Sequence, residues 1–210
     1  MSIYGDMTLD EYRDALSSSE PTPGGGTAAA VALSQGAALA VMVCNLTLKS
    51  DKWKDGWGAA NECLNVANPL LERGHELAHE DAHSFDGVMD AFRMPKSNDE
   101  EIELRRAAIY SGTLEAANVP LQTAKLALDL LASLPALAQT GNSNAVTDVG
   151  VAGLLASAAC KGALFNVEIN LNSIPTDMGI EQREEMDEIR EMCQKLSRSV
   201  MQTVNEKMRS

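Results

Sequence analysis

Aromatic side chains are scarce in this sequence: its 210 residues include only three Phe, three Tyr and two Trp. Because 45% of the residues are hydrophobic, a core can still form, and it has to be built from Ala, Leu, Val, Ile and Met. Strand signals are also few, since apolar and polar residues rarely alternate and runs of β-branched residues are uncommon. The sequence therefore predicts an all-α fold, a bundle of about six helices, several of them long, in a single domain over residues 1–210.

Basic residues are outnumbered, because 17 Lys and Arg face 30 Asp and Glu and leave a net charge of −13. An acidic chain repels phosphate backbones and anionic lipid, so we expect neither nucleic-acid nor membrane partners. No basic segment followed by an apolar run opens the chain, which predicts no signal peptide. The cysteines Cys44, Cys63, Cys160 and Cys193 lack C-x-x-C spacing. This favours reduced thiols in a cytoplasmic protein.

Charged residues are absent between Pro21 and Leu48, a stretch long enough to cross a bilayer. Gln35, Gly36 and Asn45 interrupt this stretch, and large apolar side chains are few in it. The composition favours a buried helix of a bundle over a membrane span. Helices are expected shortly after Thr8 and over about 26–48, 59–94, 97–140 with a bend at Pro120, 147–171 and 180–208.

Asp81 is the one acid on an otherwise apolar helix face. Projected at about 100° per residue, the helix over 59–94 places these residues on the same face: Leu70, Gly74, Leu77, Phe85, Val88 and Phe92. A carboxylate in such a position is either paired or has a raised pKa, and both arrangements suit general acid/base catalysis. The structural alternative is that Asp81 caps a neighbouring helix or pairs with a buried Arg.

Three histidines, His75, His79 and His83, recur every fourth residue on the same helix. A pair of histidines at this spacing can bind zinc. The projection places them away from Asp81, among acidic residues on the polar face. We therefore expect a solvated face and no metal site.

The helix over 147–171 carries a stripe of small residues and amides. The residues close to the direction of Asp148 are Asn144, Ala152, Leu155, Ala159, Gly162, Asn166 and Asn170. Small residues let another backbone approach, while the amides need polar partners. Those partners are a polar ligand, a neighbouring helix or a second subunit. Asp148 by itself also suits a helix N-terminus electrostatically.

The segment Pro23-Gly24-Gly25-Gly26 matches neither G-x-G-x-x-G nor a P-loop, and no strand precedes it. Glycines let backbone N–H groups come close to a ligand, and the helix N-terminus that follows favours a negative or oxygen-rich group. The alternative is a tight turn without a binding role.

Several blocks of this sequence, taken in order, resemble the cyclodeaminase domain of the formiminotransferase-cyclodeaminase family. They cover the chain from about Thr8 to Ile174. The blocks are P-T-P-G-G-G-T-A-A-A, G-A-A-L-A-V-M-V-C-N-L-T, E-D-A-H-S-F with V-M-D-A-F-R-M-P-K, V-P-L, G-N-S-N-A-V-T-D-V-G-V-A and F-N-V-E-I-N-L.

The resemblance implies an all-α homodimer that acts on a tetrahydrofolate derivative, its substrate, with no cofactor and no metal. The activity implied is that of a methenyltetrahydrofolate cyclohydrolase or of a formiminotetrahydrofolate cyclodeaminase, with Asp81 as the general acid/base. The segments S-S-S-E-P-T-P-G-G-G and M-V-C-N-L-T are closer to the stand-alone cyclohydrolase type, which favours the first activity. From another class, a folate-binding helical dimer without turnover is the alternative.

The resemblance also implies a set of substrate contacts. Lys49, with Lys52 and Lys54, forms a basic cluster that suits the glutamate tail of folate, although a solvated loop explains it as well. The polar stripe suits either pterin contacts or the dimer seam. The candidate binding residues are Pro23, Gly24, Gly25, Gly26, Asn45, Lys49, Asn142, Asn144, Asp148, Asn166 and Asn170.

Overall fold

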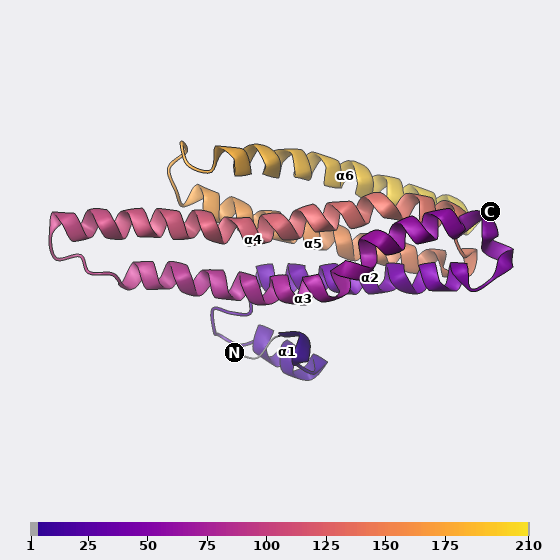
Figure 1. Ribbon diagram of the computed structural model, residues 1–210, viewed down its shortest axis with the longest axis horizontal. Helices are drawn as coiled ribbons and strands as arrows, with labels where there is room; N and C mark the ends of the chain where they lie inside the picture. The colour runs from indigo at the N-terminus through magenta and orange to yellow at the C-terminus, as the bar shows by residue number, and fades with distance from the viewer. Residues whose placement is uncertain (1–3, 210) are drawn as a thin grey trace.

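The computed structural model describes residues 4–209, and within that range it contains helices and no strands (Figure 1). This confirms the all-α prediction. The first three residues, which belong to the segment predicted not to be a signal peptide, lie outside the described range. The helices are η1 (Tyr4–Asp6), α1 (Leu9–Leu16), α2 (Gly25–Leu48), η2 (Asp51–Gly56), α3 (Trp57–Arg93), α4 (Asp99–Thr140), η3 (Ser143–Ala145), α5 (Val146–Asn172) and α6 (Ile180–Arg209).

The ends of these helices follow local signals in the sequence. Thr8 caps α1 in a capping box, in which the Glu11 N–H donates to Thr8 Oγ1 at 3.2 Å and the Thr8 N–H donates to the Glu11 carboxylate at 2.7 Å. Pro120 and Pro135 lie inside α4, which Figure 1 shows as one continuous helix. By contrast, the N-cap residue of α2, Gly24, has no side chain with which to cap it.

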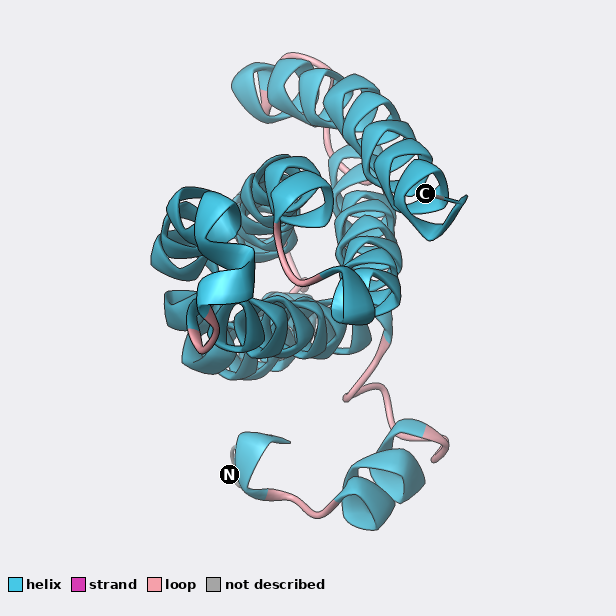
Figure 2. Cartoon of the chain, turned by 90° about the vertical axis from the view of Figure 1, so that its right-hand side faces the viewer, coloured by secondary structure: helices cyan, strands magenta, loops and turns pink. Residues whose placement is uncertain are grey.

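Helices α2, α3, α4 and α5 form a ring in which each packs against the next, and α6 lies over α4 and α5 (Figure 2). The largest fully buried side chains are Leu and Val, with Ala filling much of the remaining core. Small residues let the helices approach closely: a Cβ added to Gly74 of α3 would lie 2.8 Å from Ser34 Cβ of α2. Among residues 4–209 no aromatic side chain is fully buried, as the composition predicted, and Tyr4 and Tyr110 pack partly buried against the core.

Two parts of the chain extend beyond this ring. The C-terminal part of α3 and the N-terminal part of α4 continue past the other helices as a two-helix arm (Figure 1). Helix α1 stands off the bundle, and η1 joins it to α3, where Gly5 packs against the His75 ring. The head of α2 lies where the arm leaves the ring.

Three segments, α2, α4 and 143–172, are long and apolar enough to cross a membrane by length and composition. In the structure, 50–56% of each apolar window is buried inside the bundle. The α2 stretch is therefore a packed bundle helix, as expected. The absence of a membrane partner remains a prediction.

All four cysteines are buried free thiols. The structure adds an arrangement that their spacing in the sequence did not reveal. Cys44 of α2 lies against Cys63 of α3, and Cys160 of α5 lies against Cys193 of α6. Each pair is part of a helix–helix contact.

Candidate functional site

A cavity of about 370 Å³ opens at the N-terminal end of α2. The helices α2, α3, α4 and α5 all contribute to its wall. Its lining residues are Pro21, Thr22, Gly24, Gly25, Gly26, Asp81, Ser84, Phe85, Val88, Ala116, Asn166, Ile169 and Asn170. Asp81 is the only carboxylate, and the only readily titrated side chain, among them. The structure therefore brings six of the predicted site residues together: Asp81, three glycines and two asparagines.

Asp81 of α3 caps α2 from outside that helix. The Thr27 hydroxyl donates to Asp81 Oδ2 at 3.2 Å, and the Thr27 backbone N–H also bonds to the carboxylate. The first N–H groups of a helix have no partners within it, and Gly24 has no side chain to supply one. The structural alternative considered for Asp81, capping a neighbouring helix, is thus observed, and the same carboxyl faces the cavity.

Gly26 makes room for this carboxyl. A Cβ at position 26 would lie 2.2 Å from Asp81 Oδ1 and 2.6 Å from its Cγ and Oδ2. Side chains do not tolerate such contacts with a carboxyl that hydrogen bonds hold in place. The third glycine of the triplet is therefore required by the approach of α3 to the head of α2.

Burial raises the pKa of Asp81 above its ordinary value, and the two hydrogen bonds from Thr27 lower it by less. A carboxyl whose pKa is moved toward neutrality exchanges a proton more readily at physiological pH. The environment of Asp81 therefore suits a group that both accepts and donates a proton.

Two amides of α5 form the opposite wall. Asn166 Nδ2 donates to the Gly162 carbonyl at 2.9 Å, and Asn170 Nδ2 donates to the Ala116 carbonyl of α4 at 3.2 Å. Each amide has two N–H donors and one oxygen, so these bonds orient the side chains and leave hydrogen-bonding capacity for a ligand.

The rest of the wall is apolar and partly open. Phe85 is 37% exposed and Ile169 is 63% exposed, and Val88 lies beside them along the cavity. Pro23 is buried behind the rim, next to the lining residue Thr22. A flat ring with polar edges suits this combination of apolar surface and few polar groups.

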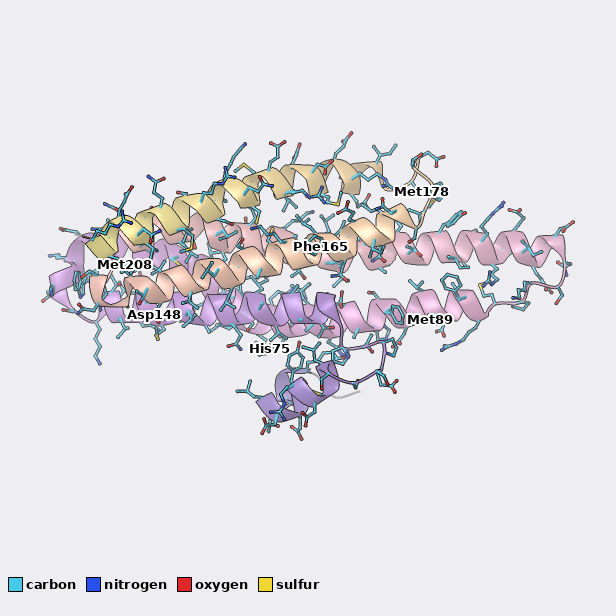
Figure 3. All side chains as sticks on the ribbon, turned by 180° about the vertical axis from the view of Figure 1, so that it is seen from behind. His75, Met89, Asp148, Phe165, Met178 and Met208 are labelled. Carbon is cyan, nitrogen blue, oxygen red and sulfur yellow. The ribbon has the colours of Figure 1, made fainter. Side chains whose placement is uncertain are left out.

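The other predicted contacts lie at the opposite end of α2, which at 24 residues is about 36 Å long. These residues are Asn45, Lys49, Asn142, Asn144 and Asp148. Asn45 and Lys49 line a separate shallow depression on α2. Figure 3 shows Asp148 near the end of the bundle farthest from Met89, which belongs to the α3–α4 arm. One chain does not bring this group to Asp81, and its binding role stays a prediction.

The histidines do not form a uniformly solvated face. His75 Nε2 lies 3.4 Å from Ser34 Oγ, and the His75 ring packs under Gly5, so the prediction was wrong for this residue. His79 and His83 line a second cavity of about 410 Å³, which shares Ser84 with the Asp81 cavity. Within residues 4–209 no three His, Cys, Asp or Glu side chains are placed to hold a metal ion.

Comparison with known proteins identifies the family. The family model described as formiminotransferase-cyclodeaminase matches residues 8–188. The chain belongs to this family. Its match includes Asp81, the glycine triplet and both cavity asparagines.

Relatives within the formiminotransferase-cyclodeaminase family differ in length. The chain is 33% identical to the methenyltetrahydrofolate cyclohydrolase of Methylorubrum extorquens, over 98% of this chain and 100% of that protein. It is 36% identical to the formimidoyltransferase-cyclodeaminase of Gallus gallus, of which it spans only 31%. The solved structure of formiminotetrahydrofolate cyclodeaminase from Thermotoga maritima superposes with a TM-score of 0.84 at 28% identity, over 96% of this chain and 98% of that one.

Sequence reasoning missed two features of the Asp81 cavity. Thr27 is a lone hydroxyl in an apolar run, and its contact with Asp81 joins residues 54 positions apart. The only hint was a helix that begins with glycines and no capping side chain. Ile169 and Ala116 were missed because apolar residues on a cavity wall have the same sequence pattern as core residues.

Proposed function

We propose that this chain is a methenyltetrahydrofolate cyclohydrolase, which converts 5,10-methenyltetrahydrofolate to 10-formyltetrahydrofolate with Asp81 as general acid/base. The enzyme class rests on the family, whose named relatives are cyclohydrolases and cyclodeaminases of folate one-carbon metabolism. The specific reaction is supported by identity to a named cyclohydrolase over nearly the full length of both chains. We expect the enzyme to be cytoplasmic and to need no cofactor or metal.

The observation that carries the proposal is the isolation of Asp81. It is the one carboxylate among the residues that line the cavity, its pKa is raised by burial, and Thr27 holds it in place. Hydrolysis of the methenyl bridge needs one group that moves a proton between two positions. Asp81 supplies such a group.

The reaction proceeds in two steps around a tetrahedral carbon. Water adds to the carbon between the 5- and 10-nitrogens, and Asp81 accepts the proton that the water loses. The carbon–nitrogen bond to position 5 then breaks, and Asp81 returns the proton to that nitrogen. The hydroxyl on the tetrahedral carbon loses its proton to solvent as the carbonyl forms, which accounts for the positive charge of the methenyl bridge. The one-carbon unit remains on the 10-nitrogen as a formyl group, and the carboxylate is regenerated.

The remaining cavity residues would orient the substrate. The cavity volume of about 370 Å³ is of the size that holds a small ring system. Phe85 and Ile169 offer apolar surface to the ring, and the amides of Asn166 and Asn170 offer hydrogen bonds to its polar edge. The N–H groups at the head of α2 favour an oxygen that gains negative charge during the reaction.

Formiminotetrahydrofolate cyclodeaminase is the second candidate. It is favoured by the close superposition with the Thermotoga maritima protein of that name, which is also a chain of similar length. In that reaction the 10-nitrogen attacks the formimino carbon, and ammonia leaves with a proton that Asp81 would donate. The same carboxyl serves both reactions, so the cavity alone does not choose between them.

We further propose that the chain acts as a homodimer through the outer faces of α2 and α5. Helix α2 has no charged residue, and both helices expose apolar side chains: Met42, Leu46, Val151, Leu154 and Phe165. A two-fold axis crossing α2 near its midpoint pairs the two copies antiparallel. Such a dimer brings the Asn45–Lys49 end of one copy toward the Asp81 cavity of the other.

A paired assay tests the activity. Purified protein is given 5,10-methenyltetrahydrofolate in one cuvette and 5-formiminotetrahydrofolate in another, and the near-ultraviolet absorbance of the methenyl group is followed in both. Loss of absorbance in the first above the buffer rate supports the cyclohydrolase, and appearance in the second with release of ammonia supports the cyclodeaminase. Binding of folate with no change in either leaves the non-catalytic alternative.

Two variants that are each expected to have low activity, produced together, test the dimer. Asp81→Asn and Lys49→Ala chains are produced together in one cell and compared with each variant alone. The mixed dimer has one cavity with both residues intact, so we expect activity above that of either variant. Activity no higher than the mean of the two contradicts a site shared between copies.

A further inference from the structure

We propose that Thr27 is a positioning residue that holds the Asp81 carboxyl in the one orientation from which it transfers a proton. This inference rests on the proposed function, because it assigns the residue that prepares the acid/base group of the same site. Nothing in the sequence pattern singles out Thr27, which lies in an alanine-rich stretch of α2.

The geometry carries the inference. Thr27 is 0% exposed, and its hydroxyl reaches Asp81 Oδ2 at 3.2 Å. Its backbone N–H bonds to the same carboxylate. A hydroxyl that is fully buried and directed at a carboxyl from another helix fixes that carboxyl, because both groups would otherwise be left without partners.

Gly26 completes the restraint from the other side. The carboxyl packs so closely on the Gly26 backbone that a Cβ there would lie 2.2 Å from Oδ1. No side chain in residues 4–209 other than that of Thr27 hydrogen-bonds to this carboxyl. Hydrogen bonds on one side and close contact on the other leave Asp81 a single side-chain orientation.

The groups around Asp81 allow the effect of Thr27 to be isolated. Helix α2 has no charged residue, α4 contributes Ala116 to the cavity, and α5 contributes Asn166 and Asn170. The nearby titratable groups belong to the neighbouring cavity. They are Glu80, which is paired with Arg73, then His79, His83 and, from α4, Glu115. Thr27 is thus the polar side chain in direct contact with the carboxyl.

The test compares Thr27→Val, which removes the hydroxyl at nearly constant volume, with Thr27→Ser, which keeps it. The matched control is Thr123→Val on α4, where a buried threonine donates only to the Val119 carbonyl of its own helix. For each variant, kcat, KM and the pH profile of kcat are measured on the folate substrate turned over by the unaltered enzyme, and Asp81→Asn is run beside them. Circular dichroism checks that each variant is folded.

We expect Thr27→Val to lower kcat by about 10- to 100-fold, with KM changed by less than about threefold. The midpoint of the pH profile moves to higher pH, because the hydrogen bonds of Thr27 lower the pKa of Asp81. This direction holds whether Asp81 acts as acid or as base. Thr27→Ser restores both quantities, and Thr123→Val resembles the unaltered enzyme.

Three outcomes separate the claims. Unaltered kcat and pH midpoint in Thr27→Val, with Asp81→Asn inactive, overturn the inference and leave the proposed function intact. An active Asp81→Asn overturns the proposed catalytic role itself. A loss in Thr27→Ser as large as in Thr27→Val shows that packing and not the hydroxyl matters, and so contradicts the inference. If Thr27→Val does not fold, Thr27→Ala gives the same comparison.

Discussion

Each end of α2 has a buried threonine packed close to a glycine: Thr27 follows Gly26, and Thr47 packs against Gly141. The groups that complete the hydrogen bonding of the two ends differ. At the C-terminal end, the Thr47 hydroxyl donates to the Val43 carbonyl at 2.8 Å and accepts the Asn142 N–H at 3.0 Å. The Trp57 indole N–H donates to the Thr47 carbonyl at 3.2 Å, and Gly141 packs against the hydroxyl. Here backbone groups and an indole satisfy the helix end, and no titratable group takes part.

At the N-terminal end, the cap is a carboxyl from another helix. Burial raises the pKa of Asp81, so its ionised form is less favourable than in water, and the cavity beside it is open to a ligand. An amide or hydroxyl would cap α2 without this cost. The two ends thus differ in that only the N-terminal one places a costly group at a structural position, and this difference supports the proposed catalytic role of Asp81.

Among variants at the two ends of α2, Gly26→Ala is expected to have the largest effect on stability and activity. The added Cβ would lie 2.2 Å from Asp81 Oδ1, so either the carboxyl or the head of α2 has to move. We expect a loss of about 1–3 kcal/mol in the free energy of unfolding. Activity is expected to fall by about tenfold or more, because the proton-transfer group is displaced. Urea unfolding and the folate assay measure the two effects.

Gly58→Ala is the matched control, because Gly58 is also the second residue of its helix and no atom lies within 4 Å of its added Cβ. Alanine there is expected to leave activity unchanged and to stabilise the protein by up to about 1 kcal/mol. Equal behaviour of the two variants contradicts the close packing of Asp81 on Gly26.

A smaller effect is expected at the other end of α2. Thr47→Val leaves the Asn142 N–H without its acceptor, which costs about 1–3 kcal/mol of stability. Activity per folded molecule is expected to fall less than in Gly26→Ala, since Thr47 is about 30 Å along the helix from the Asp81 cavity of its own chain and approaches that of a second copy only in the proposed dimer. Thr140→Val, which removes an exposed hydroxyl bonded to the Ala136 carbonyl, is the control and should change stability by less than about 0.5 kcal/mol. A fall in activity at constant stability would show that the two ends are coupled.

The smallest effect is the pH dependence of stability. The folded-state pKa of Asp81 is raised above its ordinary value of 3.8, so the folded protein binds more protons than the unfolded chain between these two values. The contribution of Asp81 to stability is therefore fully present below the ordinary pKa and is lost as pH rises through the raised one. Asp81→Asn lacks this dependence, so we expect it to gain stability relative to the unaltered protein as pH increases.

Urea unfolding of both proteins at several pH values from 4 to 8 measures this difference. An unaltered protein that gains stability relative to Asp81→Asn with rising pH would show that the cap, and not burial, dominates at this position.

Much of the fold was predictable, because long helices carry their ends in local sequence. The predicted starts and ends of α2, α3, α5 and α6 lie within two residues of those observed. The apolar face containing Asp81 was also found by projection, since it depends only on the helical period. The match of family blocks in order predicted the family.

The sequence could not show how far apart two residues of one stripe lie along a helix, or which residues of different helices touch. Projection placed Asp148 and Asn166 on one stripe, yet they are 18 residues apart, or about 27 Å along α5. Likewise, the angle of His75 suggested solvent, because the covering segment η1 is far away in sequence. The hydrogen bond between Thr27 and Asp81 was unpredictable for the same reason, because only the packing of α2 on α3 creates it.

The central claim is that Asp81 at the head of α2 carries the proton in a folate reaction. The most direct measurement is the paired folate assay on Asp81→Asn, with circular dichroism as the check on folding. We predict that the folded variant turns over whichever substrate the unaltered enzyme uses at least about 100-fold more slowly. A folded Asp81→Asn that retains the unaltered rate would contradict the claim and leave Asp81 as a helix cap alone.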